Sequence, residues 1–128
     1  MKKLSIILAL LTLSCPLTQP VKPLNDLAIT EGNEIRIDTY RAQNLPPLVV
    51  NFLLLHELGH VILRHSKEGK DWRQVREMEL EADCWAGRHS LPEEKLAAID
   101  WFRTMGPVTF DKFHYSGYMR AVKIWECS

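Results

Sequence analysis

The chain has 128 residues, of which 46% are hydrophobic and 25% charged, and its formal net charge is zero. This balance favours one globular domain with a single core and argues against a disordered chain. Because lysine and arginine are not in excess, we expect no nucleic-acid partner.

The first fifteen residues, MKKLSIILALLTLSC, have the pattern of an export signal. Two lysines precede an apolar run (4–13) that is too short to span a membrane. We therefore expect residues 1–14 to be a signal peptide, the protein to be periplasmic or secreted, and the mature chain to have no transmembrane helix. Two routes of processing remain open. The residues ending at Cys15 resemble a bacterial lipobox, which would place a lipid anchor on Cys15, whereas ordinary cleavage after Ser14 needs only small residues.

Residues 15–30 contain three prolines and no periodicity, so an extended linker is expected, followed by one domain over residues 31–128. Polar and apolar residues alternate over 34–38, which predicts a short strand. A turn signal at 31–33 indicates a small hairpin with the segment around 27–29.

Four helices are expected after this hairpin. Proline pairs, capping residues and glycines set their ranges at about 46–66, 72–88, from a Ser-x-x-Glu capping box at 90–93 to 105, and 117–125. The predicted class is α+β, mostly helical, with a small sheet near the N-terminus.

The first of these helices carries a His-Glu-x-x-His motif in an apolar stretch, NFLLLHELGHVILRH. Residues four apart share a helix face, so His56 and His60 can hold one Zn²⁺, and Glu57 projects beside it as a general base. The alternative is that both histidines are core residues satisfied by hydrogen bonds, which burial would make costly without several partners. His65 is one residue out of register for a third ligand and is interpreted as a solvated helix end.

A catalytic zinc needs a third protein ligand, and the second helix offers one in EMELEAD. At 100° per residue, Glu77 and Glu81 fall on a polar stripe with Cys84. Glu79 faces the core and the first helix, so it is the predicted third ligand. Asp83, one turn further, is the predicted acceptor that orients a ligand imidazole.

Cysteine usage fits an oxidising compartment. Setting Cys15 aside leaves an even pair, Cys84 and Cys127, for which we predict a disulfide.

With these motifs in place, the chain resembles the gluzincin metallopeptidases, in which an HExxH helix is followed by a glutamate in an ExxAD-type motif. It is most similar to the minigluzincins and to bacterial neutral zinc metallopeptidases, through ELEADCWAG. It also resembles the prenyl-protease and heat-shock-protease branch, through His114 and Arg120, although Tyr115 replaces the usual proline. The resemblance spans residues 34–125 and implies a zincin-like minidomain in which the strand at 34–38 lines the substrate cleft.

The resemblance implies hydrolysis of peptide bonds in a peptide or protein substrate, with one Zn²⁺ per chain and Glu57 as the base. His114 is the favoured donor to the oxyanion, and Tyr115, Tyr118 and Arg120 are further candidates for transition-state or substrate contacts. The alternative function is a zinc-stabilised, non-catalytic or regulatory envelope protein. The intact Glu57 favours the enzyme, because a purely structural site has no use for a base beside the metal.

Overall fold

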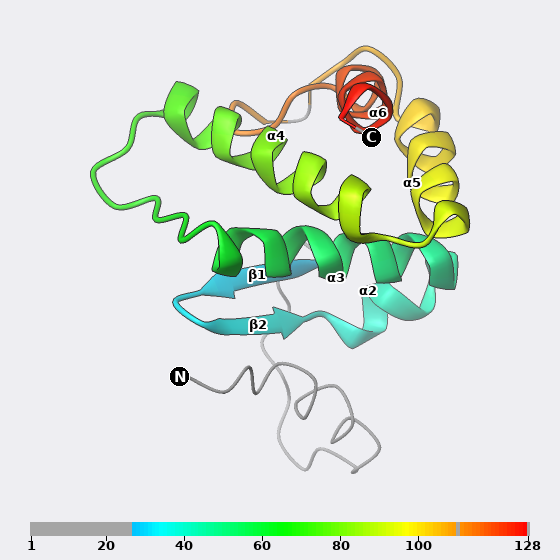
Figure 1. The fold of residues 1–128 in the computed structure, drawn as a ribbon, viewed down its shortest axis with the longest axis horizontal. Coiled ribbons are helices and arrows are strands. Elements are labelled where there is room, and N and C mark those ends of the chain that lie inside the picture. Colours follow the sequence, from blue (N-terminus) through cyan, green and yellow to red (C-terminus); the bar gives the residue numbers. More distant parts are fainter. Residues whose placement is uncertain (1–26, 110, 128) are drawn as a thin grey trace, which may run out of the picture.

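The computed structural model describes residues 27–109 and 111–127, which form a two-stranded hairpin followed by five helices (Figure 1). The predicted α+β class, mostly helical with a small N-terminal sheet, is confirmed. The predicted signal peptide, Cys15 and most of the predicted linker lie outside the described residues.

The hairpin pairs β1 (Ala28–Glu31) with β2 (Glu34–Ile37) in antiparallel register, so that Ala28 faces Ile37. β1 begins inside the segment predicted as linker, so the folded domain starts before residue 31. In Figure 1, β1 lies beside the long helix α3 and β2 forms the outer edge. The expectation that the strand at 34–38 lines the substrate cleft stays a prediction, and the hairpin residue that lines the cavity beside the motif histidines is Ala28 of β1.

Two helices follow the hairpin, α2 (Thr39–Gln43) and α3 (Pro47–Ile62). The sequence did not predict α2, which begins where the Asp38 side chain accepts a hydrogen bond from the Arg41 amide. Pro47 opens α3 as predicted, but the helix ends at Ile62 rather than near residue 66. It stops early because Arg64 adopts a left-handed backbone with φ of 57°.

The remaining helices are α4 (Trp72–His89), α5 (Pro92–Thr104) and α6 (Gly117–Glu126), close to their predicted ranges. The predicted capping box at 90–93 is shifted by one residue. Leu91 is the first residue of the cap, and its amide donates to the Glu94 carboxylate at 2.9 Å. This shift follows from Pro92, whose fixed φ suits the first position of a helix.

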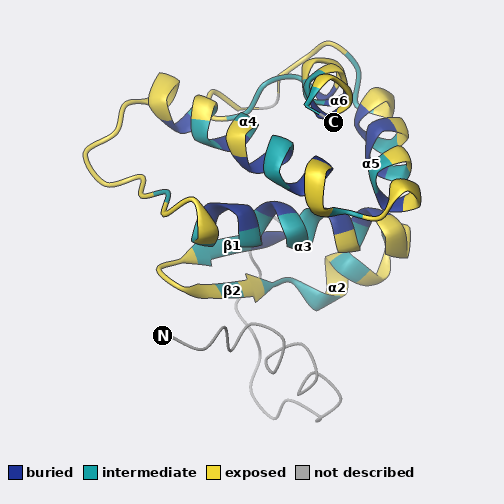
Figure 2. Cartoon of the chain, viewed as in Figure 1, coloured by how far each residue is buried: buried dark blue, intermediate teal, exposed yellow. Residues whose placement is uncertain are grey.

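The four longer helices enclose the core, while the hairpin packs against the opposite side of α3 from α4 (Figure 1). Figure 2 shows buried stretches on the helices, whereas the hairpin is mostly half-buried or exposed. The buried apolar cluster consists of Phe52, Ala86, Ala98, Ile99, Phe102, Ala121 and Ile124. Within the described part of the chain, no helix is both long and apolar enough to cross a membrane.

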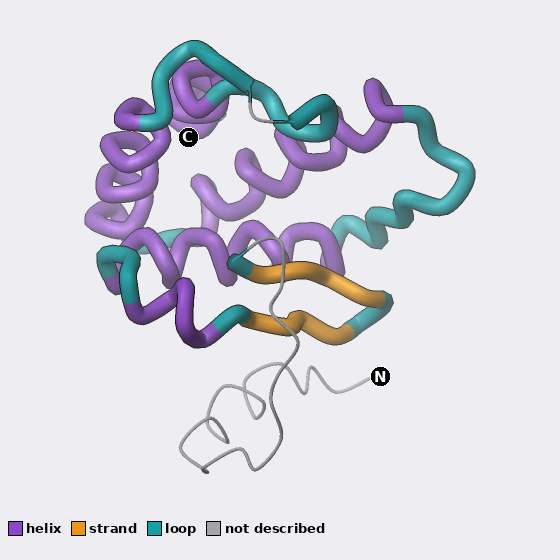
Figure 3. Tube along the Cα trace, turned by 180° about the vertical axis from the view of Figure 1, so that it is seen from behind, coloured by secondary structure: helices purple, strands orange, loops and turns teal. Residues whose placement is uncertain are grey.

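The start of α6 is fixed against the end of α5 by a close approach at Gly117. A Cβ placed there would lie 2.2 Å from the Phe102 carbonyl oxygen and 2.7 Å from the Met105 Cβ, so only glycine fits. Seen from behind in Figure 3, the loop between α5 and α6 crosses to the N-terminal half of α4. There the Tyr115 hydroxyl donates to Glu77 at 2.7 Å. The loop is thus held against α5 at Gly117 and against α4 at Tyr115.

Candidate metal centre

The two motif histidines lie one turn apart on the buried face of α3, as predicted. Their Nε2 atoms are 3.1 Å apart, and both residues are buried. Gly59, between them, allows α4 to approach closely, because a Cβ there would sit 3.3 Å from the backbone of Ala82. The glycine of HELGH therefore brings the carboxylates of α4 within reach of the imidazoles.

Glu79 of α4 completes the cluster, as the helical phase predicted. Its Oε2 atom lies 3.0 Å from His56 Nε2 and 3.3 Å from His60 Nε2. The predicted polar stripe is also present, since Glu77 and Glu81 are both exposed. Three atoms that can each offer a lone pair therefore converge on one point.

The spacing of these atoms fits a tetrahedral zinc ion. Ligands 2.0–2.1 Å from a metal at the corners of a tetrahedron lie about 3.3 Å from one another, and the three separations here are 3.0, 3.1 and 3.3 Å. His56 and His60 also form a looser trio with Glu57, whose ligand atoms lie within 4.8 Å of one another. The trio with Glu79 is the one whose separations match the ligand spacing of zinc, and Glu57 lies beside it.

The electrostatics of this point favour a cation. Burial disfavours the charged form of His56, but the carboxylates of Asp83 and Glu79 outweigh burial and raise its pKa to about 10. Burial likewise opposes the ionised form of Glu79, yet hydrogen bonds from His114, His56 and His60 hold the pKa of this carboxyl well below its usual range. The cluster thus favours positive charge at its ring nitrogens, which a proton or a metal ion can supply.

Asp83 orients the first imidazole, in the position predicted for it. Its Oδ1 atom lies 2.8 Å from His56 Nδ1, and the residue is fully buried. Arg120 of α6 donates to both carboxylate oxygens at 2.8 Å. Burial raises the pKa of Asp83, but Arg120 and His56 lower it by more than burial raises it, and the result is a pKa of about 2. Arg120 was a candidate for contacts with substrate, which stays a prediction: its guanidinium donates to Asp83, and the residue also lines the cavity beside the motif histidines.

Glu57 stands at the edge of a cavity next to the cluster. The cavity is lined on its apolar side by Leu27, Ala28, Leu53, Trp101, Phe102, Met105 and Val108. Thr30 of β1 donates to the Glu57 carboxylate and lies 3.2 Å from its carbonyl oxygen. The hairpin therefore fixes the orientation of the carboxylate predicted to act as a base.

His114 reaches the same cluster from the loop between α5 and α6. Its Nε2 atom lies 3.2 Å from Glu79 Oε2, and its Nδ1 atom lies 2.9 Å from Asp111. Burial lowers the pKa of His114, but the contact with Glu79 reverses this and raises it above its ordinary value. Tyr115 lines the cavity as well. Tyr118 is 55% exposed and is not brought into this set.

Three residues beside the cluster were missed or misread in the sequence. Lys67 Nζ lies 3.4 Å from Glu79 Oε1, and Thr30 contacts Glu57 from a strand far away in the sequence. His65 was interpreted as a solvated helix end, which is wrong, because its side chain is 9% exposed and contacts both His60 and Glu81. Thr30 is far from the motif in the sequence, and His65 and Lys67 lie beyond the end of α3 at Ile62, so helical periodicity could not place them.

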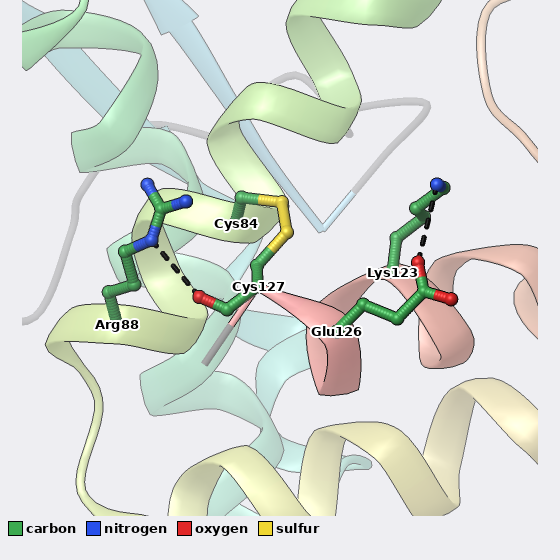
Figure 4. The surroundings of a disulfide bond; sticks show 5 residues. All are labelled: Cys84, Arg88, Lys123, Glu126 and Cys127. Carbon is green, nitrogen blue, oxygen red and sulfur yellow. Dashed lines mark hydrogen bonds and ion pairs between the residues drawn. A yellow bond between two sulfur atoms is a disulfide. The ribbon is translucent and has the colours of Figure 1, made fainter.

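The predicted disulfide between Cys84 and Cys127 is present (Figure 4). It joins α4 to the residue after α6, and Arg88 donates to the Cys127 carbonyl oxygen at 3.0 Å beside it. Cys84 directly follows Asp83 in the sequence. The bond therefore ties α6, which carries Arg120, to the segment of α4 that orients His56.

Comparison with known proteins adds a family. Residues 17–110 match the family described as Peptidase U49, which is well over half of the chain. No curated protein and no solved structure matches the chain.

Proposed function

The chain belongs to the peptidase U49 family, and we propose that its peptidase activity depends on one zinc ion held by His56, His60 and Glu79. The observation that carries this proposal is the convergence of two imidazole nitrogens and a carboxylate oxygen at mutual distances of 3.0–3.3 Å. Two histidines and one glutamate are the ligand set of gluzincin-type peptidases, which leaves a fourth position for water or substrate.

A bound zinc ion supplies Lewis acidity, which makes a water molecule more acidic and polarises the scissile carbonyl. Glu57, held by Thr30 at the edge of the cavity, removes a proton from the attacking water and passes it to the leaving amine nitrogen. In its protonated form His114 donates one hydrogen bond from Nδ1 to Asp111, which orients the ring, and one from Nε2 to the developing oxyanion.

The decisive variant is Glu57→Gln, which keeps the shape of the side chain and removes the base. We expect it to retain one zinc per chain and to lose about 10²- to 10⁴-fold in peptide hydrolysis. Glu93→Gln, at an exposed position of α5, is the matched control and should behave as wild type. Zinc content is measured by elemental analysis and turnover with a set of fluorogenic peptides and an unfolded protein.

The outcome also separates this proposal from a zinc-stabilised regulatory protein. If wild type and Glu57→Gln both hold zinc and hydrolyse the same substrates equally slowly, Glu57 is not a catalytic base. A second pair of variants tests the ligand set. Glu79→Ala should no longer bind zinc, whereas Glu81→Ala should still bind one ion, and the reverse result would reject the assignment of Glu79.

We also propose that the enzyme works outside the cytoplasm, after removal of a signal peptide ending at residue 14. A disulfide between Cys84 and Cys127 supports this proposal, because such bonds persist in oxidising compartments. Intact mass of the protein recovered from the cell envelope tests it and distinguishes a lipid on Cys15 from ordinary cleavage. A full-length chain found in the cytoplasm would reject export.

A further inference from the structure

The second motif histidine needs a partner on the side of its ring that faces away from the cluster. His60 Nε2 points to His56 and Glu79, so it can offer a lone pair to a metal only when the ring proton is on Nδ1. His60 Nδ1 lies 2.9 Å from His65 Nδ1. An N–H on His60 would therefore donate to a lone pair on His65.

The end of α3 explains how His65 comes to lie there. The Arg64 amide donates to the Val61 carbonyl oxygen at 3.2 Å, and the His65 amide donates to the His60 carbonyl oxygen at 2.9 Å. This pair of bonds, with Arg64 left-handed at φ of 57°, is a Schellman motif. The backbone of His65 is thus bound to the residue whose side chain it contacts, and the two rings meet edge to face at 5.0 Å.

Glu81 determines which nitrogen of His65 can accept. His65 Nε2 lies 2.9 Å from Glu81 Oε2, and a carboxylate can only accept, so the proton of a neutral His65 resides on Nε2. The Nδ1 atom of His65 then has a free lone pair directed at His60.

We propose that His65, held by Glu81, is the positioning residue that fixes the tautomer and orientation of His60 for zinc. This inference rests on the proposed function, because it assumes that His60 is a zinc ligand. It assigns to the His60–His65–Glu81 arm the task that Asp83 performs for His56. Partners of this kind typically contribute 10- to 100-fold to the affinity of a metal site.

Zinc affinity of the purified, disulfide-bonded protein, measured by competition with a chromophoric chelator, tests the proposal. We expect His65→Leu, which has no acceptor, to raise the zinc dissociation constant by about 10- to 100-fold. His65→Asn keeps an acceptor at the position of Nδ1 and should stay within about threefold of wild type. His89→Ala, at the exposed end of α4, is the control histidine and should not change affinity. Long-range ¹⁵N NMR of the zinc-bound wild type should show the His60 proton on Nδ1.

The outcomes are distinguishable. If wild type binds zinc and His65→Leu binds it within about twofold, or if the leucine and asparagine variants lose affinity equally, the positioning role is rejected while the proposed function stands. If wild type binds no zinc, the proposed function and this inference both fail.

Should His65→Leu not fold, Glu81→Ala decides, because the Glu81 side chain is 64% exposed and its removal leaves the core intact. Affinity lowered by about 10-fold or more supports the proposal, and affinity within about threefold of wild type rejects it.

Discussion

The two motif histidines are one helical turn apart, yet their Nδ1 atoms face very different surroundings. His56 contacts Asp83, which is fully buried and accepts two hydrogen bonds from Arg120. His60 contacts His65, whose own partner, Glu81, is 64% exposed. We refer to these as the buried arm (His56, Asp83, Arg120) and the exposed arm (His60, His65, Glu81).

The difference separates stability from metal binding. Water cannot reach the buried arm to hydrate its charges, so each charged group depends on its partners. Removing one group leaves an unpaired ion in the core. In the exposed arm, water can hydrate Glu81 when its partner is lost, so an ion pair there contributes little to folding. We therefore expect the buried arm to govern both folding and zinc binding, and the exposed arm to govern mainly zinc binding.

The largest effect is expected from breaking the buried arm. Asp83→Ala leaves Arg120 and His56 without their shared carboxylate and should lower the free energy of unfolding by about 3–5 kcal/mol. Glu81→Ala in the exposed arm should change it by no more than about 0.5 kcal/mol. Urea unfolding with a chelator present measures both without a contribution from metal. Equal losses in the two variants would contradict the distinction between the arms.

The disulfide is expected to have the next largest effect, since it joins α4 to the end of α6, two of the three helices that carry the buried arm. Replacing Cys84 and Cys127 together by serine opens a link across 43 residues. The entropy of closing such a loop predicts a loss of about 4 kcal/mol in the free energy of unfolding, and measured losses are commonly 2–4 kcal/mol. The same urea experiment on reduced wild type should give a similar value. If the double serine variant unfolds at the same urea concentration as wild type, the disulfide does not hold α6 in place.

The dependence of stability on pH tests the ion pair between Asp83 and Arg120 in the buried arm. The pKa of Asp83 is about 2 in the folded chain, against about 3.9 in an unfolded one. A lowered pKa contributes stability above pH 4, and this contribution is lost as the pH falls towards 2. Arg120→Met removes the main cause of the lowering, so the variant lacks most of this contribution and has less of it to lose as the pH falls. The difference in stability between wild type and variant should therefore shrink by up to about 2 kcal/mol between pH 5 and pH 2.

Arg73→Met, at an exposed position of α4, is the control for that titration. Its stability curve should run parallel to that of wild type throughout the acid range. An Arg120→Met curve that is also parallel would mean that Arg120 does not stabilise the ionised form of Asp83.

The buried arm could be predicted in part from the sequence, and the reason is local geometry. Helical spacing alone places His56 and His60 on one face of α3, and Glu79 and Asp83 on one face of α4. Long helices with strong terminal signals, such as the capping Asp71 before α4, are also predictable. The five-residue helix α2 was missed because a segment of that length carries no period to recognise.

The exposed arm could not be predicted, because it depends on a backbone conformation for which the sequence carries no signal. Left-handed residues at helix ends are usually glycine, and here the position holds Arg64. Without that signal, a helix continued to residue 66 would point His65 away from His60. Contacts between distant segments, such as Thr30 with Glu57, were hidden for a similar reason: they require the tertiary arrangement of the hairpin on α3.

Arg64 is thus the position where the exposed arm can be tested through the backbone alone, with the smallest expected effect. A side chain in the left-handed region costs about 1 kcal/mol relative to glycine. Arg64→Gly should therefore raise the free energy of unfolding by up to about 1 kcal/mol, as measured with urea, and leave zinc affinity unchanged because the Schellman motif is kept. Arg64→Val should do the opposite, since a β-branched residue resists this conformation. If the valine variant loses stability but binds zinc as tightly as wild type, the turn at Arg64 does not position His65, and the exposed arm has no part in holding the metal.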